Sequence, residues 1–332
     1  MSDFFPFVSI CTPTFNRRPF IPYIIRCFQN QTYPMNKIEW IIIDDGTDPI
    51  EDLVKHIPQV KYYYYDKKML LGEKRNRMHE KCSGDIIVYM DDDDYYPPER
   101  VQHAVEMLTD NPDYLLAGSS EMHIYFDSNR SVYQCGPYKE YHATAATFAF
   151  KRQLLNETSY DGNNALAEET KFTKGYTIPM LQLDTLKTIM VFSHKHNSLN
   201  KEKLLESPEK SKMINSRFKV DDFIKDPILK QFYMYDMNTL LSDYEPGKPE
   251  NKPEVLVQID ELEQTRKQRI AEHNKMLATQ QRIKSAIPED NAHHLRRNYE
   301  KQIADKNIII NELLKKLKEL TNELAEYKAG RL

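Results

Sequence analysis

The sequence has little glycine, a single tryptophan and no long apolar run. Of 332 residues, 9 are glycine and 1 is tryptophan, whereas 21 are tyrosine, a composition typical of an ordered, aromatic-rich protein. No apolar stretch approaches the roughly 20 residues that cross a bilayer, so we expect no membrane span. The opening MSDFFPFVSI has neither the basic region nor the cleavage site of a signal peptide, so we expect no secretory leader.

An excess of one charge is also absent. Lys and Arg number 46 against 50 Asp and Glu, a net charge of −4, so the overall charge does not favour nucleic acid. The four cysteines fall inside apparent strands and helices without CxxC spacing: Cys11, Cys27, Cys82 and Cys135. This pattern predicts buried free thiols in a reducing compartment, and we expect a cytoplasmic protein.

Apolar runs and helical patterns alternate through the first half of the chain. The runs are short and rich in β-branched or aromatic residues, as strands buried on both faces are. We predict strands at 7–11, 38–43, 60–65 and 85–90, and helices at 20–28, after Gly72 and after Pro97-Pro98. This alternation predicts an α/β fold with a mainly parallel sheet flanked by helices.

The pattern loosens after residue 114, and we expect a catalytic domain over 1–205, with halves at about 1–110 and 111–205. Residues 206–253 are predicted to be an ancillary segment and linker. Its last part, SDYEPGKPENKPE at 242–254, holds three prolines and one glycine among polar residues. Residues 254–332 are predicted to be helical.

Apolar residues recur every seven positions near the end of the chain, which predicts a coiled coil and a homo-oligomer. One set is Ile303, Ile310, Leu317 and Leu324, and the offset set is Leu313, Leu320 and Tyr327. Pro288 should break the helix before them. The tail is therefore a helical hairpin or a bent rod, or alternatively a helix packed on its own catalytic domain.

Acidic residues follow two of the predicted strands. Asp91–Asp94 come directly after the strand at 85–90, at the end where parallel α/β sheets bind ligands. Adjacent carboxylates raise each other's pKa, and Mg²⁺ or Mn²⁺ would reverse that cost. A solvated acidic turn is the alternative, but the run abruptly ends an apolar strand. Asp44-Asp45-Gly46 similarly follows 38–43, where an ordinary Asp-Gly turn is the alternative.

Three ordered segments carry a resemblance to a known family. They are VSICTPTFNR at 8–17, EWIIIDDGT at 39–47 and GEKRNRMHEKCSGDIIVYMDDDDYYPPERV at 72–101. Together they resemble the family 2 glycosyltransferases of the GT-A fold, over residues 7 to about 200. The resemblance implies an inverting hexosyltransferase-type enzyme that uses a nucleotide-sugar, most simply a UDP-sugar, with Mn²⁺ or Mg²⁺.

The resemblance also implies roles for individual residues. Its DxD motif falls on Asp91 and Asp93, with Asp93 as the preferred metal ligand and Asp91 as the other metal-site carboxylate, more favoured as a partner of the ribose or of the metal's ligands. The residues implied for nucleotide binding are Pro13, Thr14, Asn16, Asp44, Asp45, Arg75, Asn76, Asp91 and Asp92. Lys74 and Arg77 are expected on the solvated face of the same helix as Arg75.

The implied catalytic base lies further along the chain. Glu168-Glu169 stands where the family usually has Glu-Asp, which puts Glu169 in the position of the base and Glu168 beside it. A late histidine often completes the metal site in such enzymes. Here His194 is favoured, with His196 as the substitute; ordinary polar histidines near an acceptor loop are the alternative.

Two absences narrow the function further. The Gln-x-x-Arg-Trp motif of processive synthases is missing, so we expect transfer of one sugar to a glycan, lipid-linked or protein acceptor. A nucleotidyltransferase would favour a Gly-rich loop after the first strand, and CTPTFNRRP has no glycine. The non-enzymatic alternative is a coiled-coil scaffold carrying a degenerate transferase domain.

Overall fold

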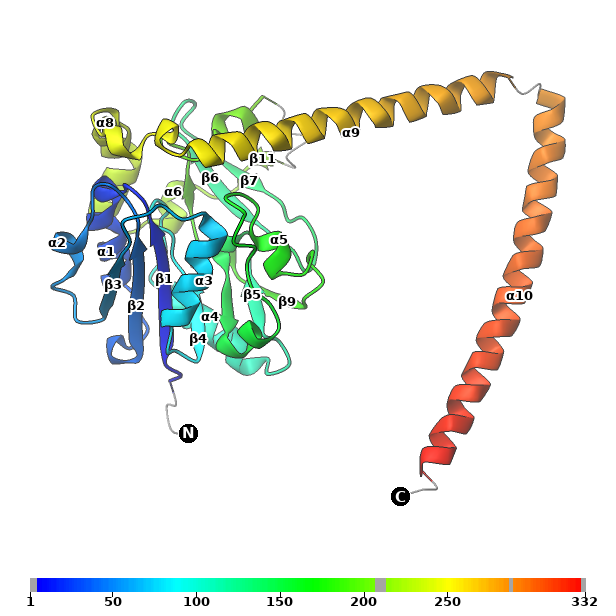
Figure 1. Ribbon diagram of the computed structural model, residues 1–332, viewed down its shortest axis with the longest axis horizontal. Helices are drawn as coiled ribbons and strands as arrows, with labels where there is room; N and C mark the ends of the chain where they lie inside the picture. The colour runs from blue at the N-terminus through cyan, green and yellow to red at the C-terminus, as the bar shows by residue number, and fades with distance from the viewer. Residues whose placement is uncertain (1–4, 207–212, 287–288, 330–332) are drawn as a thin grey trace. The chain divides into compact units, whose positions relative to one another are not determined.

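The computed structural model describes residues 5–206, 213–286 and 289–329 (Figure 1). It divides into two compact units, Met1–Glu261 and Leu262–Leu332. The first unit contains both sheets and the candidate site.

The main sheet of the first unit has seven strands in the order β3-β2-β1-β4-β8-β5-β9. β1, β2, β3 and β4 are parallel, β8 is antiparallel to both of its neighbours, and β5 and β9 are parallel to each other. The bounds are β1 Val8–Thr14, β2 Ile38–Asp44, β3 Val60–Tyr64, β4 Ile86–Tyr89, β5 Leu116–Gly118, β8 Ala149–Lys151 and β9 Met180–Gln182. The predicted α/β fold with a mainly parallel sheet is confirmed.

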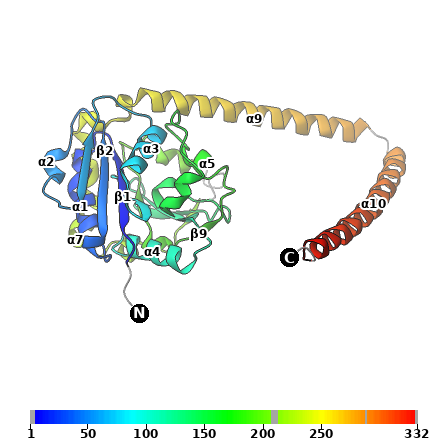
Figure 2. The ribbon, with the colours of Figure 1, turned by 60° about the horizontal axis from the view of Figure 1, so that its bottom comes forward.

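Alternate side chains of the central strands enter two separate apolar cores, because successive residues of a strand point to opposite faces. Val8 and Ile10 pack with the apolar faces of α1 (Ile21–Gln29) and α4 (Arg100–Asp110). Cys11 and Ile41 pack instead with residues of α3 (Leu71–Lys81) and α5 (Glu169–Phe172). The sheet is therefore covered on both faces (Figure 2). The four cysteines are buried and free, as predicted.

A smaller sheet and several short helices complete the first unit. The strand order is β10-β6-β7-β11, with β6 Met122–Phe126, β7 Ser131–Cys135, β10 Val191–Phe192 and β11 Met213–Asn215. The remaining helices are α2 Glu51–Val54, α6 Val220–Phe223, α7 Pro227–Gln231 and α8 Met237–Ser242. A backbone bridge between Tyr95 and Met190 joins the turn after β4 to the chain just before β10.

The proline-rich stretch at 242–254 packs against the first unit. It contains two short 3-10 helices, Glu245–Gly247 and Pro249–Asn251, and Lys252 is only 7% exposed. Prolines at the start of each helical turn fix the backbone there, so the same residues that suggest a linker build a compact covering. α9 (Pro253–Ala286) begins directly after it.

The helical tail consists of the rest of α9 and of α10 (Glu289–Ala329). Pro288, the predicted break, lies outside the described residues, as do the side chains of Leu324 and Tyr327. Ile303, Ile310 and Leu313 are at least 50% exposed in the single chain. The coiled coil stays a prediction. Across the described ranges, no helix is both long and apolar enough to cross a membrane.

Candidate active site

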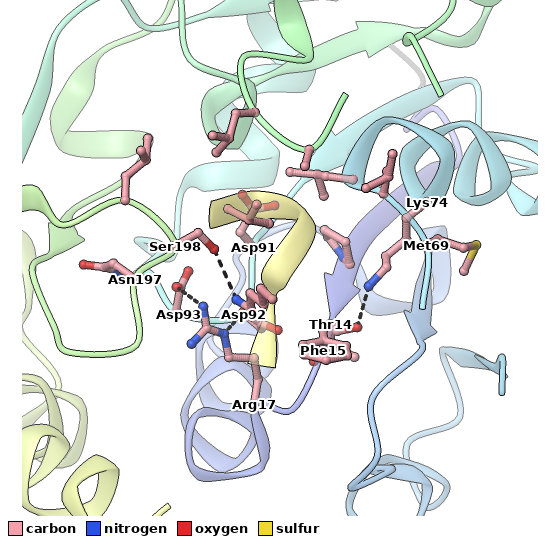
Figure 3. A pocket seen from close by; sticks show the side chains of 18 of the residues that line it. Thr14, Phe15, Arg17, Met69, Lys74, Asp91, Asp92, Asp93, Asn197 and Ser198 are labelled. Atoms are coloured by element: carbon pink, nitrogen blue, oxygen red, sulfur yellow. Dashed lines mark hydrogen bonds and ion pairs between the residues drawn. The ribbon is translucent and has the colours of Figure 1, made fainter. Parts of the chain in front are cut away.

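The carboxyl ends of β1, β2 and β4 meet at one edge of the main sheet, where a cavity of about 300 Å³ opens. Six of the residues expected in the site line it: Pro13, Thr14, Arg75, Asp91, Asp92 and Asp93 (Figure 3). Parallel strands place the residues that follow them side by side, so residues far apart in the chain become neighbours here.

The acidic run after β4 does not carry four equal charges. Burial raises the pKa of Asp92 to about 7 and that of Asp94 well above its ordinary value. Burial would also raise the pKa of Asp93. The charge of Arg17 and the hydrogen bond with His194 outweigh burial and hold the pKa of Asp93 well below its ordinary value. Asp93 is therefore ionised at neutral pH, the state that a cation ligand needs.

Arg17 neutralises part of this acidic run from the turn after β1. Its Nη2 lies 3.1 Å from Asp93 Oδ2 and its Nε lies 3.6 Å from Asp92 Oδ1. Its Nη1 donates to the backbone oxygen of His196 at 3.0 Å. The side chain is almost fully buried, so its charge is held in place by these contacts.

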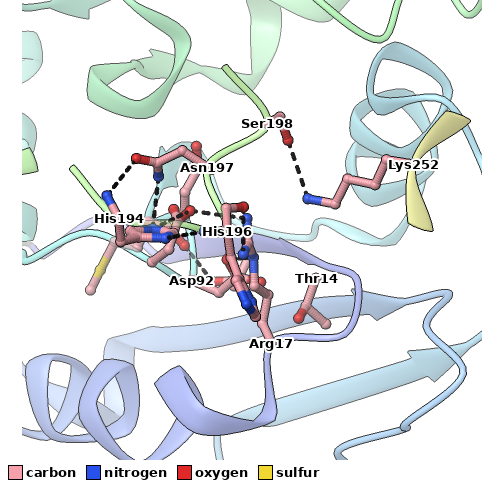
Figure 4. A network of polar contacts seen from close by, with 12 residues as sticks. Thr14, Arg17, Asp92, His194, His196, Asn197, Ser198 and Lys252 are labelled. Carbon is pink, nitrogen blue, oxygen red and sulfur yellow. Dashed lines mark hydrogen bonds and ion pairs between the residues drawn. The ribbon is translucent and has the colours of Figure 1, made fainter. Parts of the chain in front are cut away.

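His194 comes to the same carboxylate from 101 residues further along the chain (Figure 4). Its Nε2 lies 3.2 Å from Asp93 Oδ2 and 2.7 Å from Asn197 Nδ2. Burial lowers the pKa of His194 to about 3, so the ring is neutral, and its Nδ1 accepts from the His196 amide at 3.2 Å. Neither His194 nor His196 lines the cavity, and the Nδ1 atom of His196 is buried without a hydrogen-bond partner.

These donors fit a divalent cation in part. Asp93 Oδ2 and His194 Nε2 are adjacent, and Asp92 Oδ2 is buried without a hydrogen-bond partner. Carboxylate oxygen and imidazole nitrogen suit Mn²⁺, and Mg²⁺ usually completes its shell with water and substrate phosphate. Within the described residues, no cluster of three or more His, Cys, Asp or Glu is arranged to hold a metal ion. A cation on Asp93 would also have to displace or share the contact with Arg17.

Three lysines surround the ring of Phe15 at the other side of the cavity. The Nζ atoms of Lys68, Lys74 and Lys252 lie 4.6, 5.9 and 6.0 Å from the ring centroid. Lys74 is buried and binds Asp45 and the backbone oxygen of Thr14. The expectation of a solvated Lys74 was therefore wrong, because the turn after β2 brings a carboxylate over this face of α3; Arg77 is partly exposed and pairs with Glu73.

Arg75 connects the acidic run to the predicted catalytic pair. Its Nε donates to Glu168 at 2.9 Å, and its Nη2 lies 3.4 Å from Asp91 Oδ2. Glu169 does not line the cavity; Tyr176 donates to its Oε1 at 3.3 Å. Burial, followed by the charge of Glu168, raises the pKa of Glu169.

The backbone around this pair is strained, since Ala167 (φ 52°) and Tyr176 (φ 62°) have positive φ without being glycine. Such conformations cost free energy and cluster at functional sites. Ala167 immediately precedes Glu168, and Tyr176 binds Glu169.

Three residues that were expected to contact the nucleotide instead form hydrogen bonds with backbone groups of the protein. Asn76 pairs with both the amide and the carbonyl of Tyr160, at 2.9 and 3.0 Å. Asp44 accepts from the amides of the turn that follows it and from the Tyr62 hydroxyl. Asn16 accepts from two amides of the same turn and donates to Pro246. None of the three lines the cavity, whereas Asp45 touches it through Lys74 and the Met69 amide.

The cavity residues that sequence reasoning missed include Phe15, Arg17, Lys68 and Lys252. Phe15 and Arg17 lie within the quoted segment at 8–17, so their neighbours Thr14 and Asn16 could have pointed to them. Nothing in the local pattern marks Lys252, which stands in the stretch that was predicted to be a linker.

An open, mainly parallel sheet with charged side chains gathered at the carboxyl ends of its strands is the class of α/β fold that binds ligands at that edge. Residues 9–167, just under half of the chain, match the family model described as "Glycosyl transferase family 2". This part of the chain is thus similar to family 2 glycosyltransferases, and the similarity supports glycosyl transfer as the general activity.

Solved structures that resemble the chain have low sequence identity to it. TarS of S. aureus, residues 1–349 in complex with UDP-GlcNAc, is 18% identical with a TM-score of 0.43, over 56% of this chain and 58% of that one. The mannosyltransferase PcManGT from Pyrobaculum calidifontis, in complex with GDP-Man and Mn²⁺, is 14% identical with a TM-score of 0.49, over 91% and 81%. No curated protein sequence matches the chain.

Proposed function

We propose that the protein is a metal-dependent, inverting glycosyltransferase that moves one sugar from a nucleotide-diphosphate sugar to a hydroxyl group. The observation that carries the proposal is the acidic run at the carboxyl end of β4, where ionised Asp93 lies between a neutral imidazole and the cavity. The proposed donor is a UDP-sugar, and the proposed acceptor is a glycan, a lipid-linked saccharide or a protein.

The proposed metal site consists of Asp93 and His194, with Asp91 as the second carboxylate and His196 as the substitute imidazole. A bound Mn²⁺ or Mg²⁺ would neutralise the charge that develops on the departing diphosphate. Arg17 holds the Asp93 carboxylate in position and shares its oxygen with His194. Pro13, Thr14 and Asp92 would line the nucleotide, and Arg75 would keep Asp91 oriented.

Glu169 is the proposed general base, which takes the proton of the attacking hydroxyl. A carboxylate whose pKa is raised by burial is a better base near neutral pH than an exposed one. Tyr176 fixes one oxygen of Glu169, and Arg75 fixes the neighbouring Glu168. Attack from the side opposite the leaving group would invert the anomeric centre, and the anomeric configuration of the product tests this step.

A thermal-shift panel tests the proposal directly. Wild type, Asp93→Ala and Asp113→Ala are melted with UDP, GDP, CDP or TDP, each with and without Mn²⁺. Asp113 is exposed and does not line the cavity, so it is a matched loss of one carboxylate. We expect one nucleotide to raise the Tm of wild type and of Asp113→Ala, and only when Mn²⁺ is present. The same nucleotide should not raise the Tm of Asp93→Ala. No shift with any nucleotide would favour the scaffold alternative.

We also propose that the helical tail forms a homo-oligomer. Ile303, Ile310, Leu313 and Leu320 repeat at a/d positions of α10 and are each at least 50% exposed in the single chain. Light scattering should give a mass above 39.2 kDa for the full chain and a monomer after deletion of 262–332. A monomeric full-length protein would exclude the oligomer.

A further inference from the structure

The segment that follows the helix α8 covers the cavity. Residues 244–258, here called the covering segment, lie beyond the part of the chain that matches the family. Figure 3 shows the start of α9 across the cavity, where Lys252, Glu254 and Val255 form part of its wall. The cavity is therefore completed by a segment that the family match does not include.

Contacts hold the covering segment on both sides of the cavity. Toward the sheet, Tyr244 donates to Asp48 at 2.8 Å and Pro246 accepts from Asn16 at 2.9 Å. Further along, Glu254 pairs with Lys68. On the other side, Gln258 accepts from the Ala165 amide and donates to the Asn163 carbonyl, each at 2.9 Å. These contacts fix the segment, so Lys252 has a defined position.

The amino group of Lys252 is buried and has no carboxylate partner in the part of the chain that the structure describes. It is 93% buried, and its recorded polar contact is the hydroxyl of Ser198 at 3.2 Å (Figure 4). Over the described ranges it has no ion pair. By contrast, Lys74 pairs with Asp45, and Lys68 pairs with Glu254. A buried charge is costly unless it is paired, so Lys252 lacks an anion that the cavity can admit.

The chemistry of the cavity identifies this anion. Lys252 lies about 6 Å from the centroid of the Phe15 ring, which two other lysines also approach, and it lines the same cavity as Asp91–Asp94. A diphosphate bound there would contact Lys252 and could reach a cation on Asp93 at the same time. Lysine binds phosphate as a point charge, and that attraction grows as the leaving group gains charge.

We propose that Lys252 binds the diphosphate of the donor, so that the covering segment supplies part of the donor site from outside the part of the chain that matches the family model. The identity of the donor in this inference rests on the proposed function, whereas the anion site itself rests on the buried, unpaired ammonium group.

Calorimetry on the full chain tests the site with three probes: UDP, uridine and inorganic pyrophosphate. UDP is titrated with and without Mn²⁺, and pyrophosphate without metal. Lys252→Met is compared with Lys248→Met, which removes the same charge from a partly exposed lysine of the same segment that pairs with Glu245. Lys252→Arg keeps the charge. We expect Lys252→Met to weaken UDP and pyrophosphate by about 10- to 100-fold and uridine by less than about twofold.

Each outcome supports or overturns the proposal. Full binding by Lys248→Met and partial recovery by Lys252→Arg would support it. Equal losses for uridine and UDP in Lys252→Met would show that the lysine only holds the segment, and unchanged UDP binding would also refute the site. Wild type that binds pyrophosphate through Lys252 but no nucleotide would keep the anion site and refute the proposed donor. Wild type that binds neither would overturn both.

Discussion

The part of the chain that matches the family model and the part after it contribute to the cavity in different ways. Residues 9–167 provide the four parallel strands β1 to β4, and carboxylates follow directly from the ends of β2 and β4. Residues 168–261 contain short strands, 3-10 turns and helices of four to six residues before α9, and they bring His194 and Lys252 to groups far away in the chain. The main sheet thus carries most of the acidic groups of the cavity, and residues 168–261 supply His194 and Lys252.

Glu169 stands at the boundary of the two regions, and its loss should have the largest effect. Glu169→Gln keeps the size and the contact with Tyr176 but cannot accept the proton, so turnover should fall by about 10²- to 10⁴-fold. Release of nucleoside diphosphate from the donor measures turnover, and calorimetry should show unchanged donor affinity. Glu157→Gln, at a half-exposed ion pair with Lys174, is the control. Retained turnover in Glu169→Gln would assign the base elsewhere.

Two truncations separate the covering segment from the tail. Deletion of 262–332 removes only the second unit and should leave nucleotide affinity unchanged. Deletion of 244–332 also removes Lys252 and the outer wall of the cavity, and should lower UDP affinity at least about tenfold. Circular dichroism checks that both proteins are folded. Equal affinity in the two folded truncations would mean that the part of the chain that matches the family model binds donor without the covering segment.

A substitution at one glycine should displace the covering segment without deleting it. A Cβ at Gly247 would lie 2.6 Å from His196 Nδ1 and 2.8 Å from the Asn16 carbonyl oxygen, so Gly247→Ala forces the segment outward. We expect the free energy of unfolding to fall by about 1–3 kcal/mol and the Tm to fall by about 2–10 °C. UDP should also bind more weakly.

Gly162→Ala is the matched control for this substitution, because its Cβ would meet only Glu73 Cβ at 3.9 Å. Its Tm and UDP affinity should stay close to those of wild type. A Gly247→Ala protein that also melts and binds like wild type would show that the segment tolerates displacement.

The smallest effect that we expect is the uptake of a proton by Lys252 when UDP binds. Burial, followed by the charge of Arg17, lowers the pKa of Lys252 to about 7, and Asp93, Asp92 and Lys68 also act on it. At pH 8 the free protein therefore carries Lys252 mostly neutral, and a bound diphosphate would raise its pKa again. Binding of UDP should take up close to one proton at pH 8 and much less at pH 6.

Calorimetry in buffers of different ionisation enthalpy measures this uptake. Lys252→Met should show almost none at either pH, and Lys248→Met should behave as wild type. The same uptake in wild type and Lys252→Met would assign the proton to another group.

The sequence by itself determined the four parallel strands of the main sheet and the position of its acidic edge. Apolar runs at 38–43 and 85–90 mark buried strands, and polar residues directly after such runs must lie at the strand ends, as Asp45 and Asp91–Asp94 do. These conclusions need only local patterns, because strand direction and burial follow from the period and polarity of a few neighbouring residues.

Only the tertiary structure decided which charges are paired. Lys74 was expected in solvent and is buried against Asp45, Asn76 was expected at the nucleotide and binds Tyr160, and Lys252 was expected in a linker and lines the cavity. The environment of each of these polar side chains depends on a segment distant in sequence that packs over it. Local periodicity carries no information about that segment, so the charge balance of the site appears only when the chain is folded.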